Sequence, residues 1–208
     1  MNKLLVFTFI SLLFTVLTTN AQKHELKLRY SPISLTRLDT WNGGGGAYGG
    51  TLDHSSKKHP GAIELDYDYL ISPKIMIGFN ATYDARKITN KSHSSYSTGN
   101  NYNGYGGDNY VTDYYKTTSK DRWLMVGPQF SYYYIRNEKF SLGSGAGISL
   151  VWNSEEITVN SASGTSNDVD VFFHVEAINF TFGKTNGLTG QIGFGHKGLI
   201  SLGYFVRW

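Results

Sequence analysis

The side chains best suited to chemistry are a histidine and two acidic residues in the last quarter of the chain, Asp170, His174 and Glu176. Alternate residues of a strand point the same way, so the three share one face, with His174 and Glu176 about 7 Å apart. Such a pair can orient a general base or bind a metal. A hydroxyl nucleophile is missing, because no His-x-Ser pair falls on an expected strand and Ser94, beside His93, falls in an expected loop. We therefore expect no catalytic residue, no cofactor and no metal ion.

A run of four glycines, Gly43 to Gly46, is the other motif with chemical potential. Glycine-rich loops can cradle phosphate, but this one lacks a following Lys-Ser/Thr and a strand-to-helix context. The chain has no cysteine, which excludes disulfides and thiolate metal sites. Its formal net charge of +3 gives no sign of nucleic-acid binding, and we expect none.

Most of the chain alternates apolar and polar residues with period two, which is typical of strands with two different faces. The 24 glycines and 15 tyrosines suit a single domain of many short strands. The pattern predicts eight strands, at Glu25 to about Leu35, Gly61–Ile71, Ile75–Asp84, Asp121–Ile135, Phe140–Trp152, Val169–Phe182, Leu188–Gly195 and Leu199–Trp208. Apolar residues change sides near Ile178, which indicates a bulge in the sixth strand.

The connections alternate between short and long. Short turns follow Ile71, Ile135 and Phe182, whereas residues 37–59, 86–120 and 153–168 are expected to be long polar loops. The central one is dotted with aromatic residues, Tyr96, Tyr102, Tyr105, Tyr110, Tyr114 and Tyr115. Either the neighbouring strands extend and carry an aromatic surface, or these tyrosines form a loop that contacts a ligand or a cell, since tyrosine gives a large contact area at low entropic cost.

The N-terminus has the pattern of an export signal. Lys3 precedes an apolar run from Leu4 to Leu17, and small residues precede a cleavage site after Ala21. We expect a signal peptide at residues 1–21 and a mature domain at residues 22–208. No later run reaches the roughly 20 apolar residues of a spanning helix, so a membrane location would require a closed barrel.

The final strand ends on Trp208, with Ile200, Leu202, Tyr204 and Val206 on the same face. Together with the export signal, the alternation and the short-turn/long-loop asymmetry, it resembles the closing strand of small outer-membrane β-barrel proteins of Gram-negative bacteria. The resemblance implies an all-β fold, an eight-stranded antiparallel up-and-down transmembrane barrel with short periplasmic turns and long extracellular loops. It also implies outer-membrane lipid as surroundings, the barrel-assembly machinery as a partner during biogenesis, and an unidentified surface ligand on the long loops.

If the apolar faces meet lipid, the charged faces line the barrel interior. This predicts a lumen charge network made of Glu25, Lys27, Arg29, Glu64, Asp66, Asp68, His174, Glu176 and Arg207, with Asp84 on the same side. Buried charges must be paired, because an unpaired one costs several kcal/mol. We expect Lys27 and Arg29 to meet the acids of the second strand, and Arg207 to meet Glu25 where the barrel closes.

We expect a non-enzymatic protein with a structural or surface-interaction role. Three alternatives remain at this point. A gap through the charge network would make a conducting pore, and a site at the outer rim would make a lipid-modifying barrel enzyme. A soluble periplasmic barrel of lipocalin type would invert the assignment, with an apolar interior and a polar exterior.

Overall fold

The computed structural model describes residues 23–33, 51–97, 110–195 and 197–208. The expected signal peptide, the glycine run at residues 43–46, and both Tyr102 and Tyr105 lie outside the described residues. Within the described ranges, no helix is long and apolar enough to cross a membrane.

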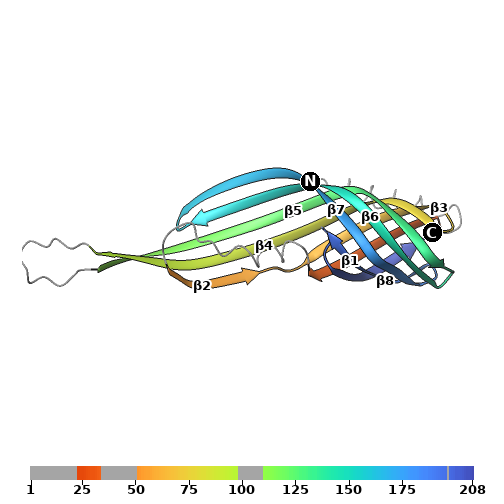
Figure 1. Ribbon diagram of the computed structural model, residues 1–208, viewed down its shortest axis with the longest axis horizontal. Coiled ribbons are helices and arrows are strands. Elements are labelled where there is room, and N and C mark those ends of the chain that lie inside the picture. The colour runs from red at the N-terminus through yellow and green to blue at the C-terminus, as the bar shows by residue number, and fades with distance from the viewer. Residues whose placement is uncertain (1–22, 34–50, 98–109, 196) are drawn as a thin grey trace, which may run out of the picture.

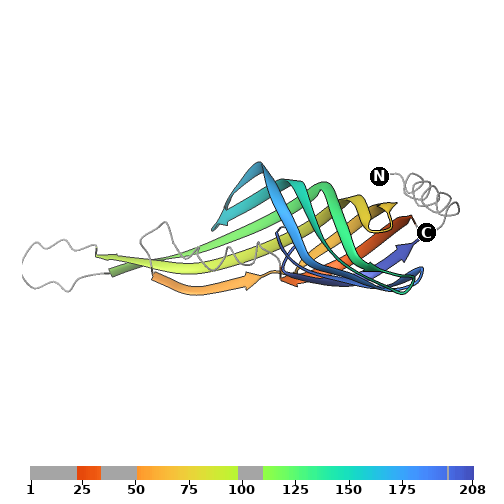
Figure 2. The ribbon, with the colours of Figure 1, turned by 45° about the vertical axis from the view of Figure 1, so that its right-hand side comes forward.

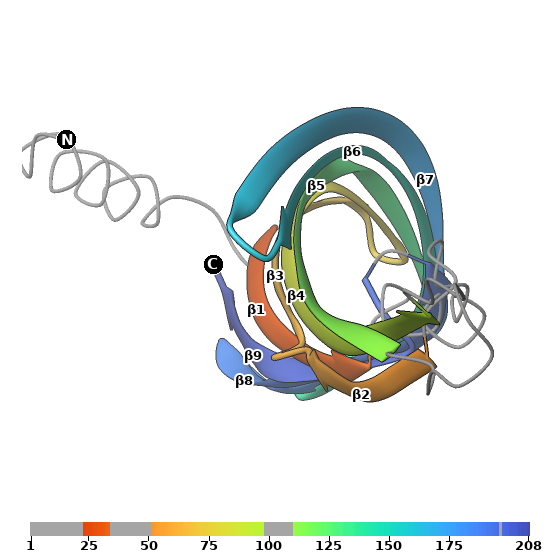
Figure 3. The ribbon, with the colours of Figure 1, turned by 90° about the vertical axis from the view of Figure 1, so that its left-hand side faces the viewer.

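The described residues form one antiparallel sheet. Its strands are β1 (His24–Ile33), β2 (Thr51–Lys58), β3 (Ala62–Ser72), β4 (Ile75–Ser97), β5 (Tyr110–Arg136), β6 (Phe140–Val159), β7 (Ala162–Gly183), β8 (Asn186–Gly195) and β9 (Ile200–Arg207). Eight of them pair in the cyclic order β4-β3-β1-β9-β8-β7-β6-β5 and back to β4, so the sheet closes on itself (Figure 3). The expected eight-stranded antiparallel barrel is confirmed.

Closure between the first and last strands follows the expected register. Glu25 lies opposite Arg207, and the pairing continues to Tyr30 opposite Leu202. Hydrogen bonds in both directions between His24 and Trp208 extend this ladder to the last residue. The backbone groups of β1 and β9 that face each other are therefore paired, as closure of the ring requires.

The barrel has a polar interior and an apolar exterior. Along β3, Glu64, Asp66 and Asp68 are fully buried, while the alternating Ile63, Leu65 and Tyr67 remain on the outside. The same alternation recurs on the other strands and leaves exposed aliphatic and aromatic side chains around the ring. The lipocalin-type alternative is thereby wrong for this chain, because that barrel would place its apolar residues inside.

The predicted bulge in β7 is confirmed. The β7–β8 register shifts between Glu176 and Ile178. Residues before the shift that face outward, such as Val175, have odd numbers, whereas those after it, such as Ile178 and Phe182, have even numbers. One extra residue at Ala177 thus keeps the apolar side chains outside along the whole strand.

Where the structure describes the long connections, most of their residues are strand and not loop, so for residues 86–120 the alternative of extended neighbouring strands holds. The β4–β5 ladder runs without a register shift from Ile75 opposite Tyr132 to Ser97 opposite Tyr110. Likewise, β6 and β7 pair up to Val159 opposite Ala162, and β2 pairs with the upper part of β4. We name the part of the sheet beyond the ring, made of β2 and residues 85–97, 110–122, 153–159 and 162–169, the projecting sheet (Figures 1 and 2).

The composition of these segments explains the difference. They are rich in serine, threonine, asparagine and glycine, which are typical of loops, but threonine and tyrosine also favour strands. Because each strand of the barrel wall continues outward beside its neighbour, the ladder hydrogen bonds continue as well. The turn at the tip of the β6–β7 hairpin contains only Asn160 and Ser161, and Asn160 has a φ of 53° there, a conformation that asparagine tolerates well.

Candidate functional site

The closing strands carry the first ion pairs of the interior. Arg207 Nε donates to Glu25 Oε2 at 2.7 Å, and the Arg207 guanidinium also reaches Thr181 Oγ1 at 3.2 Å. Lys27 Nζ lies 3.1 Å from the other oxygen of Glu25 and 2.9 Å from Asp68 Oδ2. Four charges on three neighbouring strands, β9, β1 and β3, therefore form a continuous chain at the end of the barrel near the chain termini.

Arg29 is the centre of the next layer. Its Nε donates to Glu64 at 3.1 Å, its Nη2 contacts Asp66, and Glu176 Oε1 lies 3.7 Å away across the lumen. Arg29 is buried, as are all three acids. The register produces this arrangement, because Arg29 lies directly opposite Glu64 in the β1–β3 ladder and Asp66 is the next inward residue of β3.

Lys197 is the member of the network that the sequence did not predict. It belongs to the short connection between β8 and β9, yet its side chain is fully buried inside the barrel. Its Nζ lies 3.0 Å from Glu176 Oε1 and 3.2 Å from Asp66 Oδ1, and it also donates to Gln129. This connection therefore folds back into the lumen and supplies a cation that the strands alone do not provide.

Two glycines shape the connection that carries Lys197. Gly195 and Gly198 have φ values of 136° and 93°, a region that other residues rarely adopt. A Cβ on Gly198 would also lie 2.2 Å from Ser31 Oγ. The one sequence signal for this turn was the Gly-x-x-Gly spacing around a lysine, which does not say whether the lysine points inward or into solvent.

The candidate catalytic group is only partly assembled. His174 Nε2 lies 3.6 Å from Glu176 Oε1, and both side chains are buried. Asp170 is exposed, and it lies opposite Val151 on the projecting side of β7, so it does not join the pair. Glu176 is already engaged, because Lys197 contacts one oxygen and Asn179 Nδ2 donates to the other at 2.6 Å. Its role in this geometry is to anchor cations and amides.

Neutral polar side chains fill the layer next to the charges. Gln129 Nε2 donates to Asp68 at 2.7 Å, Gln191 Nε2 donates to Glu64 at 3.3 Å, and Ser149 donates to Asn80 at 3.1 Å. Near the rim, Arg86 pairs with Asp121 at 2.6 Å and His59 lies 2.9 Å from Asp84. An eight-stranded barrel is just wide enough for side chains to fill. Here most of the buried side chains are polar, and Met76, Met125, Val151 and Phe205 are the larger buried apolar ones among them.

The described residues contain no group of three or more histidine, aspartate or glutamate side chains arranged to hold a metal ion. Every acid of the lumen charge network instead has a lysine or arginine within ion-pair distance. This arrangement stabilises a closed interior rather than an open ligand site.

The tyrosines expected to form a contact loop lie on strands where the structure describes them. Tyr96 and Tyr110 are in the β4–β5 ladder next to its tip. Tyr114 and Tyr115 are both exposed, and because they are adjacent on β5 they point to opposite faces of the projecting sheet. Only Tyr114 has a described ring partner, His93, at 6.1 Å between centroids. Tyr114 and Tyr115 therefore do not form one shared contact surface.

Comparisons with known proteins give no family. No protein-family model matches the chain, and no curated protein matches it. Among solved structures, the chain is similar to Ail, the attachment invasion locus protein of Yersinia pestis, crystallised with the heparin analogue sucrose octasulfate. The match covers 89% of this chain and 94% of that chain, with 10% sequence identity and a TM-score of 0.34. The barrel assignment rests on the strand ladder and the burial pattern.

Proposed function

We propose that the chain is an integral outer-membrane β-barrel without enzymatic activity, which holds the projecting sheet outside the cell as a surface for contacts. The observation that carries this proposal is the inversion of the barrel, with charged side chains inside and an uninterrupted apolar surface outside. In water such a surface would be a large aggregation liability, whereas in a bilayer it is the favourable arrangement.

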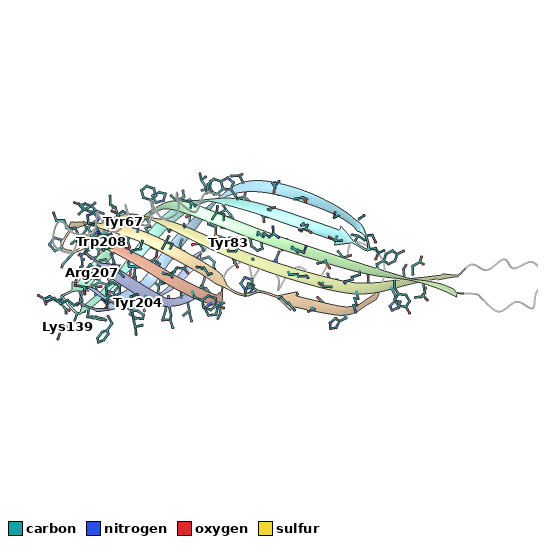
Figure 4. All side chains as sticks on the ribbon, turned by 180° about the vertical axis from the view of Figure 1, so that it is seen from behind. Tyr67, Tyr83, Lys139, Tyr204, Arg207 and Trp208 are labelled. Atoms are coloured by element: carbon teal, nitrogen blue, oxygen red, sulfur yellow. The ribbon has the colours of Figure 1, made fainter. Side chains whose placement is uncertain are left out.

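The dimensions of the apolar surface support a membrane location. On β5 its exposed apolar side chains extend from Leu124 to Tyr134, which is about 33 Å along the strand and about 25 Å along the barrel axis at the usual tilt. Aromatic rings mark both edges, with Tyr67 and Trp208 at one end and Tyr83 towards the other (Figure 4). Outer-membrane barrels have apolar bands of about this height between two aromatic girdles.

The orientation follows from the connections. The turns after β3, β5 and β7 are short and lie at the end where Trp208 lies, whereas the projecting sheet extends from the other end (Figures 1 and 4). Outer-membrane barrels have short periplasmic turns and longer extracellular segments. In this orientation the start of β1 and the end of β9 are periplasmic and the projecting sheet is outside the cell.

The filled lumen and the open sheet support a contact role over transport or catalysis. A protein whose exposed part is an open sheet needs no free path through the ion pairs of the lumen. Upper β7, residues 162–173, has no strand partner on one side among the described residues, since the β7–β8 ladder starts at His174 opposite Gly195. An unpaired strand edge can add an extended segment of another chain.

The proposal is tested by cell fractionation combined with gel migration. The mature chain should be recovered with the outer membrane, and the detergent-extracted protein should migrate differently on an SDS gel before and after boiling, because the closed ladder resists SDS. Recovery in the soluble periplasm without detergent would contradict the membrane assignment. A single gel band, identical with and without boiling, would argue against a closed barrel.

A further inference from the structure

The outer face of the projecting sheet continues the exterior of the barrel. The β4–β5 ladder has no register shift, so the outward positions of β4 continue from Tyr83 to Lys87 and Lys91. On β5 they continue from Leu124 to Lys120 and Lys116. We name the lysines and the arginine of this side the basic face: Lys58, Lys87, Lys91, Lys116, Lys120 and Arg122.

The basic face is organised in two rows across neighbouring strands. In the first row Lys58, Lys87 and Lys120 lie directly opposite one another on β2, β4 and β5. In the second row Lys91 lies opposite Lys116, with His54 on the other side of Lys91. The rows are about 13 Å apart along the strands, and neighbours within a row are about 5 Å apart.

The charge is sided, which composition alone does not show. The opposite face of the same sheet, continuous with the barrel lumen, carries more acids than cations, with Asp113, Asp121, Glu155 and Asp168 against Lys57 and Arg86 among the described residues. Among the described side chains of the basic face, Glu156 is the only carboxylate, and it pairs with Lys120 at 2.9 Å. Lys58, Lys87, Lys91 and Lys116 have no acid within ion-pair distance in the described part of the chain, and all four are exposed.

Like charges directly opposite in a ladder are destabilising. The ladder does not require charged residues at these positions, because the pair between the two rows, Thr89 and Thr118, is neutral. Three lysine-lysine pairs on one face are therefore unfavourable for the isolated sheet. An array of anions placed over the two rows would remove the repulsion between the lysines. The same lysine charges would attract the anions.

We propose that the basic face binds phosphate groups of an anionic glycolipid in the outer leaflet around the barrel. The inference rests on the membrane location proposed above. The lysines point in the same direction as the lipid-facing side chains below them. Arg122 is about 5 Å and the first row about 10 Å beyond Tyr83 along the barrel axis, the depth of the headgroups and of the first sugars. A soluble polyanion would have no reason to favour the side that continues the apolar band.

The test uses the full mature chain refolded into nanodiscs of phosphatidylcholine. The probe is lipopolysaccharide with a short core, compared with the same material after hydrofluoric acid has removed its phosphates. The triple variant Lys87→Gln, Lys91→Gln and Lys116→Gln removes charge from both rows. The matched control Lys23→Gln, Lys74→Gln and Lys139→Gln removes the same charge at the opposite end of the barrel, where Figure 4 shows Lys139.

We expect the unchanged chain to bind the phosphorylated probe and to lose affinity as salt is raised. The triple variant should bind it about 100-fold more weakly, since each lysine near an anionic surface contributes about a factor of five. The control variant should bind like the unchanged chain.

Equal binding of the dephosphorylated probe, or equal loss in both triple variants, would overturn the inference. So would binding of a soluble sulfated polysaccharide by the basic face together with no binding of the lipid. The gel shift on boiling separates this inference from the proposed function. If the chain inserts and shows the gel shift but does not bind the phosphorylated probe, only the inference about the basic face is wrong. If the chain does not insert, both this inference and the proposed function are wrong.

Discussion

Lys197 Nζ lies 3.0 Å from Glu176 Oε1, although Lys197 belongs to a connection outside the strands and Glu176 points inward from β7. The contact joins the β8–β9 connection to β7, and Lys197 also reaches Asp66 on β3 at 3.2 Å. It also brings a further cation to a cluster in which Glu64, Asp66 and Glu176 would otherwise share Arg29.

Removing the Lys197 charge should destabilise the barrel. In Lys197→Met, Asp66 and Glu176 keep their burial but lose a partner, which costs about 3–5 kcal/mol. The free energy of unfolding, measured by urea titration in lipid bilayers, should fall by this amount. Lys184→Met is the control, because Lys184 pairs with Glu138 at an exposed turn and should change the free energy little. Equal losses in the two variants would show that the lumen position is not special.

The Arg207–Glu25 contact should be most important for closing the ring. Arg207→Met leaves the buried Glu25 with Lys27 as its remaining cation partner, so we expect a smaller fraction of the chain to migrate as the compact band without boiling. Adding Glu25→Gln should restore part of that fraction, because it removes the uncompensated charge. A double variant that is worse than Arg207→Met by the full effect of Glu25→Gln alone would indicate that the two side chains are not coupled.

The barrel should not conduct ions. Its lumen is occupied by buried ion pairs and amides from β1, β3, β5, β7 and the Lys197 connection. In planar bilayers we expect no steady single-channel current from the unchanged chain. A stable, reproducible conductance would contradict the filled lumen and revive the pore alternative.

The pair His174 and Glu176 should have no catalytic role. Because Glu176 is engaged by Lys197 and Asn179, we expect the lipid composition of the envelope to be the same in cells with and without the protein. Mass spectra of lipid A and phospholipids would measure it. A lipid change that depends on the protein and disappears in His174→Ala would establish the lipid-modifying alternative instead.

The tip of the β6–β7 hairpin should tolerate glycine and resist branched residues. Asn160 has a φ of 53°, so Asn160→Gly should be nearly neutral, whereas Asn160→Val should cost about 1–2 kcal/mol of local stability. Amide hydrogen exchange in the segments that pair across this turn would show the difference. Identical exchange in the two variants would mean that the turn does not hold the hairpin.

Period-two alternation was sufficient to predict the ring. It placed Leu26, Leu28 and Tyr30 outside and Glu25, Lys27 and Arg29 inside, and short turns then fixed which strands are neighbours. Opposite charges at equivalent depths, such as Arg207 and Glu25, could be matched before any coordinates. The apolar side of each strand needs only local information, which is why this part of the fold was readable from the sequence.

The projecting sheet and Lys197 were not readable in the same way. Segments such as 110–120 have no apolar face, so nothing in their pattern distinguishes a strand held by its neighbours from a polar loop. Their structure depends on the adjacent strands of the barrel wall. Lys197 depends on the direction in which a four-residue connection folds, and both the positive φ of Gly195 and Gly198 and the contacts of Lys197 with Asp66 and Glu176 accompany that direction.

The ion pairs of the lumen charge network all lie within the ring. The projecting sheet depends instead on strand pairing and a few surface contacts, such as Lys120 with Glu156. One continuous sheet thus has a more stable part, the ring, and a less stable part, the projecting sheet. In the proposed orientation, a protease acting from outside the cell would shorten the projecting sheet without opening the barrel. The closed barrel would then stay in the membrane with its lumen filled. Loss or variation of the exposed sheet would not make the membrane permeable.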